Sequence, residues 1–348
     1  MKGGGFLACC FLVLSAGALA AKRSEPDLRH QIPTTVSAEA ARLMKEFLDR
    51  PGRPADEPLP VTQADWDRQA ATVESTATPM QQKIAREMHI STREDSLGGV
   101  RVVRILPEHF VHSGRLLVYV HGGGYVLLSA HSAISTPALL AAAIGDEVIS
   151  IDYTLAPRGN WRTVTDEVIA VWKAVLSTGA DPASIGLFGD SAGGGLAAGA
   201  LLKMRDQGIP LPGALYLGSP WADITNAGDT TKTLAEVDPI LSARTLAAAA
   251  AAYAAPADQK NPYVSPVYGD YSRPFPPTLI QAGTREIFLS QAIRQYQAIR
   301  SGGHEAILDV YEGMPHVFQA VLWGSPEAKT AVEREAAFFK EKLARRPK

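Results

Sequence analysis

Apolar residues recur along this chain with two different spacings. From residue 87 onward, short and almost continuous apolar runs, such as 115–120 and 147–152, alternate with longer segments of helical spacing, such as 136–144 and 289–301. Short apolar runs that are bounded by turn residues are typical of fully buried strands. Strands that alternate with helices predict an α/β fold with a mostly parallel central sheet and helices on both faces. In such a sheet, ligands bind at the carboxyl ends of the strands.

The expected elements of this part begin with a hairpin, in which strands 88–94 and 100–106 flank Leu97-Gly98-Gly99. Further strands are expected at 115–120, 147–152, 184–188, 213–218, 278–282 and 306–311. Helices are expected at 136–144, 166–177, 194–207, 289–301 and 326–343. After Trp221 the alternation stops, and residues 222–276, which contain an alanine-rich helix at 242–255, are interpreted as an insertion over the edge of the sheet.

The part of the chain that precedes the sheet is expected to be helical. Residues 22–36 are polar and contain prolines, which is typical of a linker. Helices are expected at 38–48, 62–73 and 80–88. Ser37 is a suitable N-cap for the first of them, and Trp66 lies on the apolar side of the second. This part either covers the larger domain as a helical cap or forms a wall of its substrate pocket.

Size and charge limit the classes of function. The chain has 348 residues, of which 46% are hydrophobic, and its formal net charge is −2. This length suffices for one large α/β domain with a small accessory part. We therefore divide the chain into a leader at 1–21, a linker with cap helices at 22–86, and a main domain at 87–348 that contains the insertion. The balanced charge gives no indication of nucleic acid or of an anionic surface as a partner.

Residues 1–21 have the features of a secretory signal peptide. A positive start is followed by a short apolar run at 6–14 and a small-x-small cleavage pattern that ends at Ala20. We expect cleavage after Ala20, export to the periplasm or the exterior, and no stable membrane association afterwards. Both cysteines, Cys9 and Cys10, lie in the apolar run, so the mature chain would contain no disulfide. An acylated leader and an uncleaved anchor remain alternatives.

The first candidate for chemistry is the G-x-S-x-G sequence Gly189-Asp190-Ser191-Ala192-Gly193. A predicted strand leads into it and a helix of small residues follows, which is the context of a nucleophile elbow. The glycines let the two arms of the turn approach without Cβ clashes, and the turn presents the Ser191 hydroxyl at the end of the sheet. A serine nucleophile also needs a general base, an acid that orients the base, and donors for the oxyanion.

The oxyanion donors are expected in the sequence His121-Gly122-Gly123-Gly124-Tyr125, which directly follows strand 115–120. Consecutive glycines allow backbone N–H groups to converge on one point, and an HGGG sequence paired with the elbow is typical of lipases and esterases. We assign the N–H groups of Gly123, Gly124 and Ala192 as the donors. His121 is expected to hold this loop by hydrogen bonds and not to act as the base.

His316 is the candidate general base because it follows the last predicted strand and precedes the closing helix. The other histidines of the chain are His30, His89, His109, His112, His121, His131 and His304. None of these has the position after the final strand that distinguishes His316.

Glu286 is the candidate acid because it follows strand 278–282, and this position gives the chain order serine, acid, histidine that the elbow predicts. A glutamate can orient an imidazole as an aspartate does, with one more methylene of reach. Asp309 and Glu312 are rivals because they lie near His316 in the sequence.

Together these motifs resemble the bacterial branch of the hormone-sensitive lipase-like esterases, which are α/β-hydrolases. The match extends from about residue 85 to the end of the chain. It rests on HGGGY at 121–125, Asp152-Tyr153-Thr154-Leu155-Ala156-Pro157, GDSAGG at 189–194, Ser219-Pro220-Trp221, Asp238-Pro239-Ile240-Leu241-Ser242 and the loop of His316. The resemblance implies a two-part cap over the active site and ester hydrolysis without a metal or an organic cofactor. Members of this family are often dimers through the edge of the last strand, so a homodimer is an open expectation.

The chain departs from the family at two positions. Arg158 follows the Ala-Pro pair where the family usually has an acidic residue, so we expect this loop to lose a contact. Glu286 stands where the family usually has aspartate, and the sequence Gly283-Thr284-Arg285-Glu286-Ile287 is similar to the branch that includes monoterpene lactone hydrolases. Small to medium esters and lactones are both open as substrates.

Two other functions remain open at this point. An amidase or N-formyl hydrolase could use the same triad, because the fold does not separate esters from amides. A non-catalytic ligand-binding protein could keep the pocket, but proteins of that kind lose the base, whereas this chain has His316.

Overall fold

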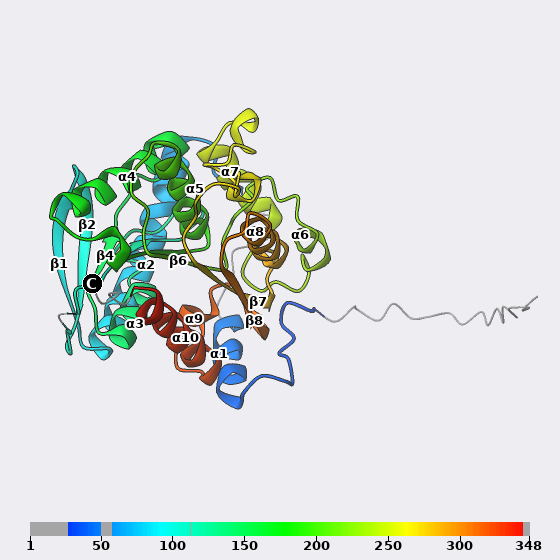
Figure 1. Ribbon diagram of the computed structural model, residues 1–348. Helices are drawn as coiled ribbons and strands as arrows, with labels where there is room; N and C mark the ends of the chain where they lie inside the picture. Colours follow the sequence, from blue (N-terminus) through cyan, green and yellow to red (C-terminus); the bar gives the residue numbers. More distant parts are fainter. Residues whose placement is uncertain (1–26, 50–57, 112, 344–348) are drawn as a thin grey trace, which may run out of the picture.

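The computed structural model describes residues 27–49, 58–111 and 113–343, so the expected leader with its cleavage site and His112 lie outside the described residues. The strands are β1 (Ile90–Leu97), β2 (Val100–Pro107), β3 (Leu116–Val120), β4 (Val148–Ile151), β5 (Ile185–Asp190), β6 (Ala214–Gly218), β7 (Thr278–Arg285) and β8 (Ala306–Pro315). They form one sheet in the order β1-β2-β4-β3-β5-β6-β7-β8 (Figure 1). The strands from β3 to β8 are parallel, and β1 and β2 are antiparallel additions at one edge.

Helices cover both faces of this sheet. They are α1 (Ala38–Leu48), α2 (Gln63–Glu87), α3 (Ser135–Ile144), α4 (Trp161–Ser177), α5 (Ala192–Asp206), α6 (Thr230–Thr233), α7 (Ala243–Tyr253), α8 (Leu289–Ser301), α9 (Phe318–Val321) and α10 (Pro326–Lys342). Helices α3 and α10 lie on one face, and α4, α5 and α8 lie on the other (Figure 1). The expected mostly parallel sheet with helices on both faces is confirmed.

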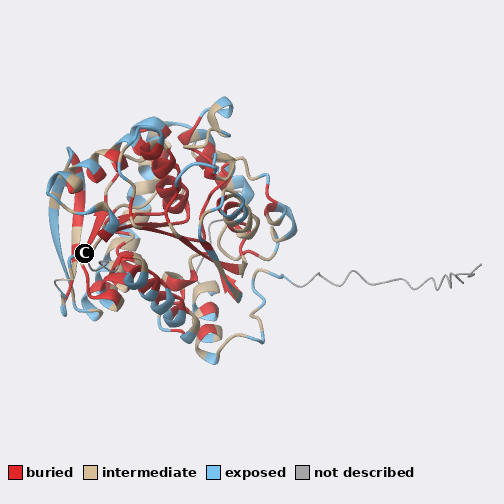
Figure 2. Cartoon of the chain, in the orientation of Figure 1, coloured by how far each residue is buried: buried red, intermediate tan, exposed pale blue. Residues whose placement is uncertain are grey.

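The core consists of two layers because successive side chains of a strand point to opposite faces of the sheet. Leu187 packs in the layer under α4 and α5, and its neighbour Phe188 packs in the layer under α3 and α10. Figure 2 shows the central strands buried between the helices. This double burial explains why the strands appear in the sequence as continuous apolar runs.

The last two parallel strands are longer than expected, since β7 reaches Arg285 and β8 reaches Pro315. Glu286 and His316 therefore follow their strands with no intervening residue. Both residues lie at the carboxyl ends of the parallel strands, where β5 also ends and Ser191 begins the turn into α5.

Helices α4 and α2 depart most from the predicted bounds, and both are longer than predicted. Helix α4 begins at Trp161, because the Asn160 side chain caps it by accepting hydrogen bonds from the backbone N–H groups of Arg162 and Thr163. Helix α2 is continuous from Gln63 to Glu87, although the sequence predicts separate segments at 62–73 and 80–88.

Tertiary contacts hold the polar middle of α2 in helical form despite the proline inside it. Glu74 accepts a hydrogen bond from the Ser129 hydroxyl, and Gln81 accepts one from the backbone N–H of Ser135. No helix in the described ranges is long and apolar enough to cross a membrane.

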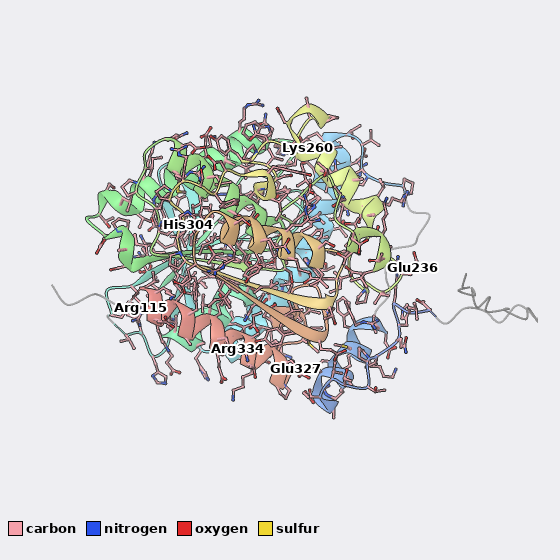
Figure 3. All side chains as sticks on the ribbon, turned by 45° about the vertical axis from the view of Figure 1, so that its right-hand side comes forward. Arg115, Glu236, Lys260, His304, Glu327 and Arg334 are labelled. Carbon is pink, nitrogen blue, oxygen red and sulfur yellow. The ribbon has the colours of Figure 1, made fainter. Side chains whose placement is uncertain are left out.

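Helix α1 has the predicted bounds, and Ser37 caps it by accepting from the backbone N–H of Ala40 at 3.1 Å. Its Ala40 and Met44 pack against residues of α9 and α10. Glu327 at the start of α10, which is labelled in Figure 3, accepts hydrogen bonds from both the N–H and the hydroxyl of Ser37. Helix α1 is thus attached to the closing helix.

Candidate active site

Ser191 occupies a strained turn between β5 and α5. Its φ is 54° and its ψ is −125°, a conformation that costs a non-glycine residue about 1–3 kcal/mol. The turn is held by hydrogen bonds from Ser191 N–H to Gly218 O and from Trp221 N–H to Ser191 O, each 2.8 Å long. A Cβ on Gly193 would lie 2.1 Å from Val120 O, so only glycine fits the other arm of the turn. The elbow therefore has the predicted geometry.

Three of the candidate residues form one chain of hydrogen bonds. His316 Nδ1 lies 2.7 Å from Glu286 Oε2, and His316 Nε2 lies 2.9 Å from Ser191 Oγ. Because a carboxylate only accepts, Nδ1–H is the donor to Glu286, and Nε2 is then free to accept from the serine hydroxyl. The three residues follow the carboxyl ends of β5, β7 and β8. These ends lie on the same side of the parallel sheet.

The surroundings of Glu286 exclude solvent and satisfy its second oxygen. Glu286 is 0% exposed, and its Oε1 accepts from Gly283 N–H at 2.7 Å and from the Ser219 hydroxyl at 3.0 Å. Ser219 Oγ in turn accepts from Val317 N–H at 3.1 Å, so this serine joins the acid turn to the loop of His316. The sequence motifs predict no role for Ser219, and the only signal for this residue is its place in Ser219-Pro220-Trp221.

The rival acids and bases have other partners. Asp309 accepts from Gln281 and from Arg334, which is labelled on α10 in Figure 3. Glu312 accepts from the Thr35 hydroxyl. Among the histidines that the structure describes, His316 is the one with an assigned contact to Ser191.

The glycine loop lies beside Ser191. Gly123 has a φ of 101° and Gly124 a φ of 64°, both in the region that favours glycine. Within the described part of the chain, no acceptor is assigned to the N–H group of either residue. Ala192 begins α5, and its N–H belongs to the first turn, which has no intrahelical acceptor. The three expected donors therefore have N–H groups available for a ligand.

His121 is fully buried and contacts its own loop. Its Nδ1–H donates to Gly122 O at 2.8 Å, and its ring stacks on Tyr153 with the centroids 4.1 Å apart. Burial lowers the pKa of the imidazole, which favours its neutral form. The Tyr153 hydroxyl donates to His121 O at 2.9 Å, so this residue pair holds the start of the loop.

An apolar cavity of about 380 Å³ opens above Ser191 and His316. Its walls come from the glycine loop, from α2 and from the insertion at 222–276. The apolar side chains from α2 and the insertion include Trp66, Ile240, Leu241, Leu246 and Ala249.

Asp190 also lines the cavity above Ser191 and is buried, with the Tyr119 hydroxyl as donor to its carboxyl group. Burial raises the pKa of Asp190 to about 6, against the opposing effects of Tyr119 and His316. The cavity therefore contains an ionisable group besides His316.

Arg158 pairs with a residue outside its own loop. Its guanidinium donates to both carboxylate oxygens of Asp67 on α2, at 3.0 and 2.7 Å. The departure from the family pattern therefore creates a contact between the main domain and the helix that carries Trp66.

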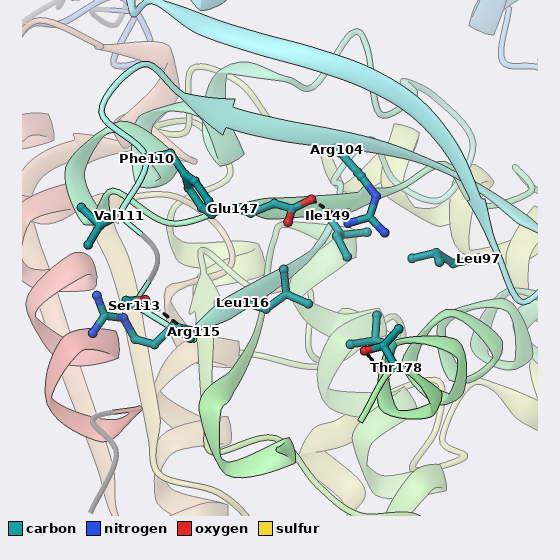
Figure 4. Close-up of a pocket in the computed structure, with 12 residues that line it drawn as sticks. Leu97, Arg104, Phe110, Val111, Ser113, Arg115, Leu116, Glu147, Ile149 and Thr178 are labelled. Atoms are coloured by element: carbon teal, nitrogen blue, oxygen red, sulfur yellow. Dashed lines mark hydrogen bonds and ion pairs between the residues drawn. The ribbon is translucent and has the colours of Figure 1, made fainter. Parts of the chain in front are cut away.

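A second cavity, of about 390 Å³, lies at the opposite ends of the strands (Figure 4). Arg104 and Arg115 line it, but Arg104 pairs with Glu147 at 2.6 Å and Arg115 with Asp146 at 2.7 Å. Its charges are thus neutralised within the protein. The described residues contain no group of three or more histidine, cysteine or carboxylate side chains that could hold a metal.

Comparisons with known proteins identify the family to which this chain is similar. The family model of the alpha/beta hydrolase fold matches residues 117–320. An acetyl-hydrolase of Streptomyces hygroscopicus is 34% identical over 229 residues, which are 65% of this chain and 76% of the relative. The crystal structure of an esterase named E25 matches 94% of this chain and 99% of its own, with 29% identity and a TM-score of 0.83.

A crystal structure of an esterase from the bacterial hormone-sensitive lipase family is 30% identical, with a TM-score of 0.77 over 88% of this chain and 99% of its own. The match to the family model, the identity to the acetyl-hydrolase and the shared fold all point to one family. The chain belongs to the α/β-hydrolases, as a hormone sensitive lipase-like esterase that hydrolyses carboxylic esters.

Proposed function

We propose that Ser191, His316 and Glu286 form a catalytic triad that hydrolyses esters through an acyl-enzyme intermediate. The observation that carries this proposal is the continuous chain of hydrogen bonds from Ser191 Oγ through the imidazole to Glu286, with links of 2.9 and 2.7 Å. These distances lie within the range required for proton transfer between a nucleophile and its base.

In the first half of the reaction, Ser191 Oγ attacks the ester carbonyl carbon while His316 Nε2 takes the hydroxyl proton. The negative charge moves to the carbonyl oxygen, where the N–H groups of Gly123, Gly124 and Ala192 stabilise it. The bond to the leaving oxygen then breaks, and His316 returns the proton to the departing alcohol. Glu286 stays ionised throughout and stabilises the imidazolium.

In the second half, water repeats these steps on the acyl-enzyme. His316 takes a proton from the water as its oxygen attacks the acyl carbon, and it then returns this proton to Ser191 Oγ as the acid leaves. A lactone would follow the same route, except that its alcohol stays attached to the acyl group. The ring-opened product would then leave only after deacylation.

The cavity supports a small to medium apolar substrate. Its volume of about 380 Å³ is at the small end of the range for ligand pockets, about 300–1,000 Å³. The similarity to an acetyl-hydrolase supports a short acyl group. We therefore propose short-chain and medium-chain carboxylic esters as substrates, with lactones of similar size included.

Replacement of the triad residues tests the mechanism. Ser191→Ala should lower hydrolysis of p-nitrophenyl butyrate by on the order of 10⁴-fold or more, and Glu286→Gln by on the order of 10³- to 10⁴-fold. Asp309→Asn is the matched control, since Asp309 contacts Gln281 and Arg334. Full activity in the Ser191 variant, or a greater loss in Asp309→Asn than in Glu286→Gln, would contradict the assignment.

A substrate panel separates the alternatives. Matched esters and amides of one acyl group, together with lactones of five to seven ring atoms, would be compared by kcat/KM. Faster cleavage of the amides would favour an amidase. Labelling of wild-type protein by a fluorophosphonate probe, and its loss in Ser191→Ala, would exclude a non-catalytic binding protein.

A further inference from the structure

Asp238 belongs to the Asp-Pro-Ile-Leu-Ser motif, to which the proposed mechanism assigns no role. Its side chain is buried, at 1% exposure. One carboxylate oxygen accepts from the N–H groups of Ile240 and Leu241, each at 2.8 Å. The other oxygen accepts from Ile287 N–H, also at 2.8 Å. One side chain therefore joins two segments that are far apart in the sequence.

One of the two joined segments lines the cavity, and the other adjoins the candidate acid Glu286. Ile240 and Leu241 line the cavity above Ser191, on the insertion side. Ile287 directly follows Glu286, whose carboxylate holds His316. A second link between the same two segments is weaker, since Arg285 Nη2 donates to Val237 O at 3.3 Å. Hydrogen bonds through Asp238 therefore link the wall of the cavity to the turn that carries Glu286.

A carboxylate is a costly choice for a purely structural link. Burial raises the pKa of Asp238, and the backbone N–H groups and His316 oppose this effect only in part. A single neutral oxygen could not serve both segments at the same geometry, whereas the two carboxylate oxygens serve one segment each.

We propose that Asp238 is a positioning residue that couples the substrate-facing segment at 240–241 to the turn of Glu286. An apolar substrate group that fills the cavity contacts Ile240 and Leu241 and fixes their position. Through Asp238 this also fixes Ile287, and with it the hydrogen bond between Glu286 and His316. Part of the binding energy of the substrate chain then appears in kcat and not in KM. This inference rests on the proposed triad.

Asp238→Asn tests the coupling because its one amide oxygen can serve only one of the two segments. In wild type, kcat should rise along the series from p-nitrophenyl acetate to hexanoate. In the variant, kcat should fall by on the order of 10- to 100-fold for the longer esters, and its dependence on chain length should flatten. The binding of the chain would then appear in KM alone.

Asp223→Asn is the matched control. Asp223 is also a fully buried aspartate of the insertion, but its partners are Thr225, Tyr268 and Arg294, away from the triad. This variant should lose stability in a similar way and still keep the chain-length dependence of kcat. If Asp238→Asn does not fold, Asp238→Glu keeps the carboxylate at a displaced position and should show the same flattening to a smaller degree.

A spectroscopic readout is independent of turnover. The proton on His316 Nδ1 should give a strongly downfield ¹H NMR resonance in wild type and in Asp223→Asn, and this resonance should broaden or move upfield in Asp238→Asn. Unchanged resonance and unchanged chain-length dependence in Asp238→Asn, or equal losses in Asp223→Asn, would overturn the inference. Failure of the triad itself is separate, because Glu286→Gln would then stay active.

Discussion

Gly123 shows how little room the oxyanion loop leaves for a side chain. Its φ is 101°, and a Cβ at this position would lie 2.2 Å from the backbone oxygen of Leu127. A contact this short cannot be relieved by a side-chain rotation, because the opposing atom belongs to the backbone. Any substitution must therefore shift the loop that carries the proposed donors.

Gly123→Ala should lower kcat/KM by on the order of 10²- to 10³-fold, the effect of losing one oxyanion donor. Steady-state kinetics with p-nitrophenyl butyrate would measure it. Gly208→Ala is the matched control, since Gly208 also has a positive φ, 69°, but open space around it. The control should cost about 1 kcal/mol of stability and leave kcat/KM unchanged. Equal activity in both variants would contradict the role of the loop.

Asp190 should make the stability of the protein depend on pH. Its pKa of about 6 lies above the value of about 3.9 in an unfolded chain, so the native state binds the proton more tightly. The stabilising contribution is fully present below about pH 4 and is lost as the pH rises through about 6. The pKa difference of about two units corresponds to about 3 kcal/mol.

Asp190→Asn removes this titration. The free energy of unfolding of the variant, minus that of wild type, should therefore increase by up to about 3 kcal/mol between pH 4 and pH 8. Urea unfolding at several pH values would give both curves. A difference that stays constant over this range would contradict the raised pKa.

Helix α2 is the element whose form depends most on tertiary contacts. Its middle is polar and contains Pro79, which interrupts the apolar spacing in the sequence. The helix itself continues through this part without a break. Contacts to Ser129 and Ser135 hold this part, and the pair of Arg158 and Asp67 holds its first half. The apolar spacing within one segment contains no information about partners in other elements. The sequence therefore predicts two helices, at 62–73 and 80–88, where the structure has one.

The pair of Arg158 and Asp67 should affect substrate binding more than stability. Both side chains are exposed to solvent, which screens the pair, so Arg158→Ala should change the free energy of unfolding little. Because α2 carries Trp66 into the cavity, KM should rise by roughly two- to tenfold with little change in kcat.

Three measurements check this expectation. The exchange of charges in Arg158→Asp with Asp67→Arg should restore KM in part, and wild-type KM should rise with ionic strength because salt screens the pair. Lys45→Ala, which removes an exposed pair with Asp49 at the end of α1, is the control and should leave KM unchanged. A KM that does not respond to Arg158→Ala would refute the role of this contact.

At the scale of the whole molecule, β8 forms one edge of the sheet in the described part of the chain. It is the last strand of the sheet, and its Ile307 and Val310 are 44% and 40% exposed. A long edge strand with apolar side chains is a template for pairing with another strand. We propose that a second copy of this chain covers it, so that two β8 strands pair in a homodimer.

Light scattering coupled to gel filtration should give the mass of a dimer for wild type at micromolar concentration. Ile307→Lys together with Val310→Lys should give the mass of a monomer, because charges on an edge strand oppose pairing. Val111→Lys is the control, since Val111 is an exposed apolar residue, at 55%, on the loop after β2. A monomeric wild type would refute the proposed dimer.

The sequence by itself determined the order of strands and helices along the chain, the parallel sheet, the elbow at Ser191 and the positions of Glu286 and His316 after the last two strands. These features depend on spacing within short segments, which the chain displays directly. Only the tertiary structure decided that Glu286, and not Asp309, contacts His316, and that α2 is one helix. It also decided the partners of Ser219, Asp238 and Arg158. Each of these contacts joins residues far apart in the chain, and their meeting depends on how the strands align, which no local pattern encodes.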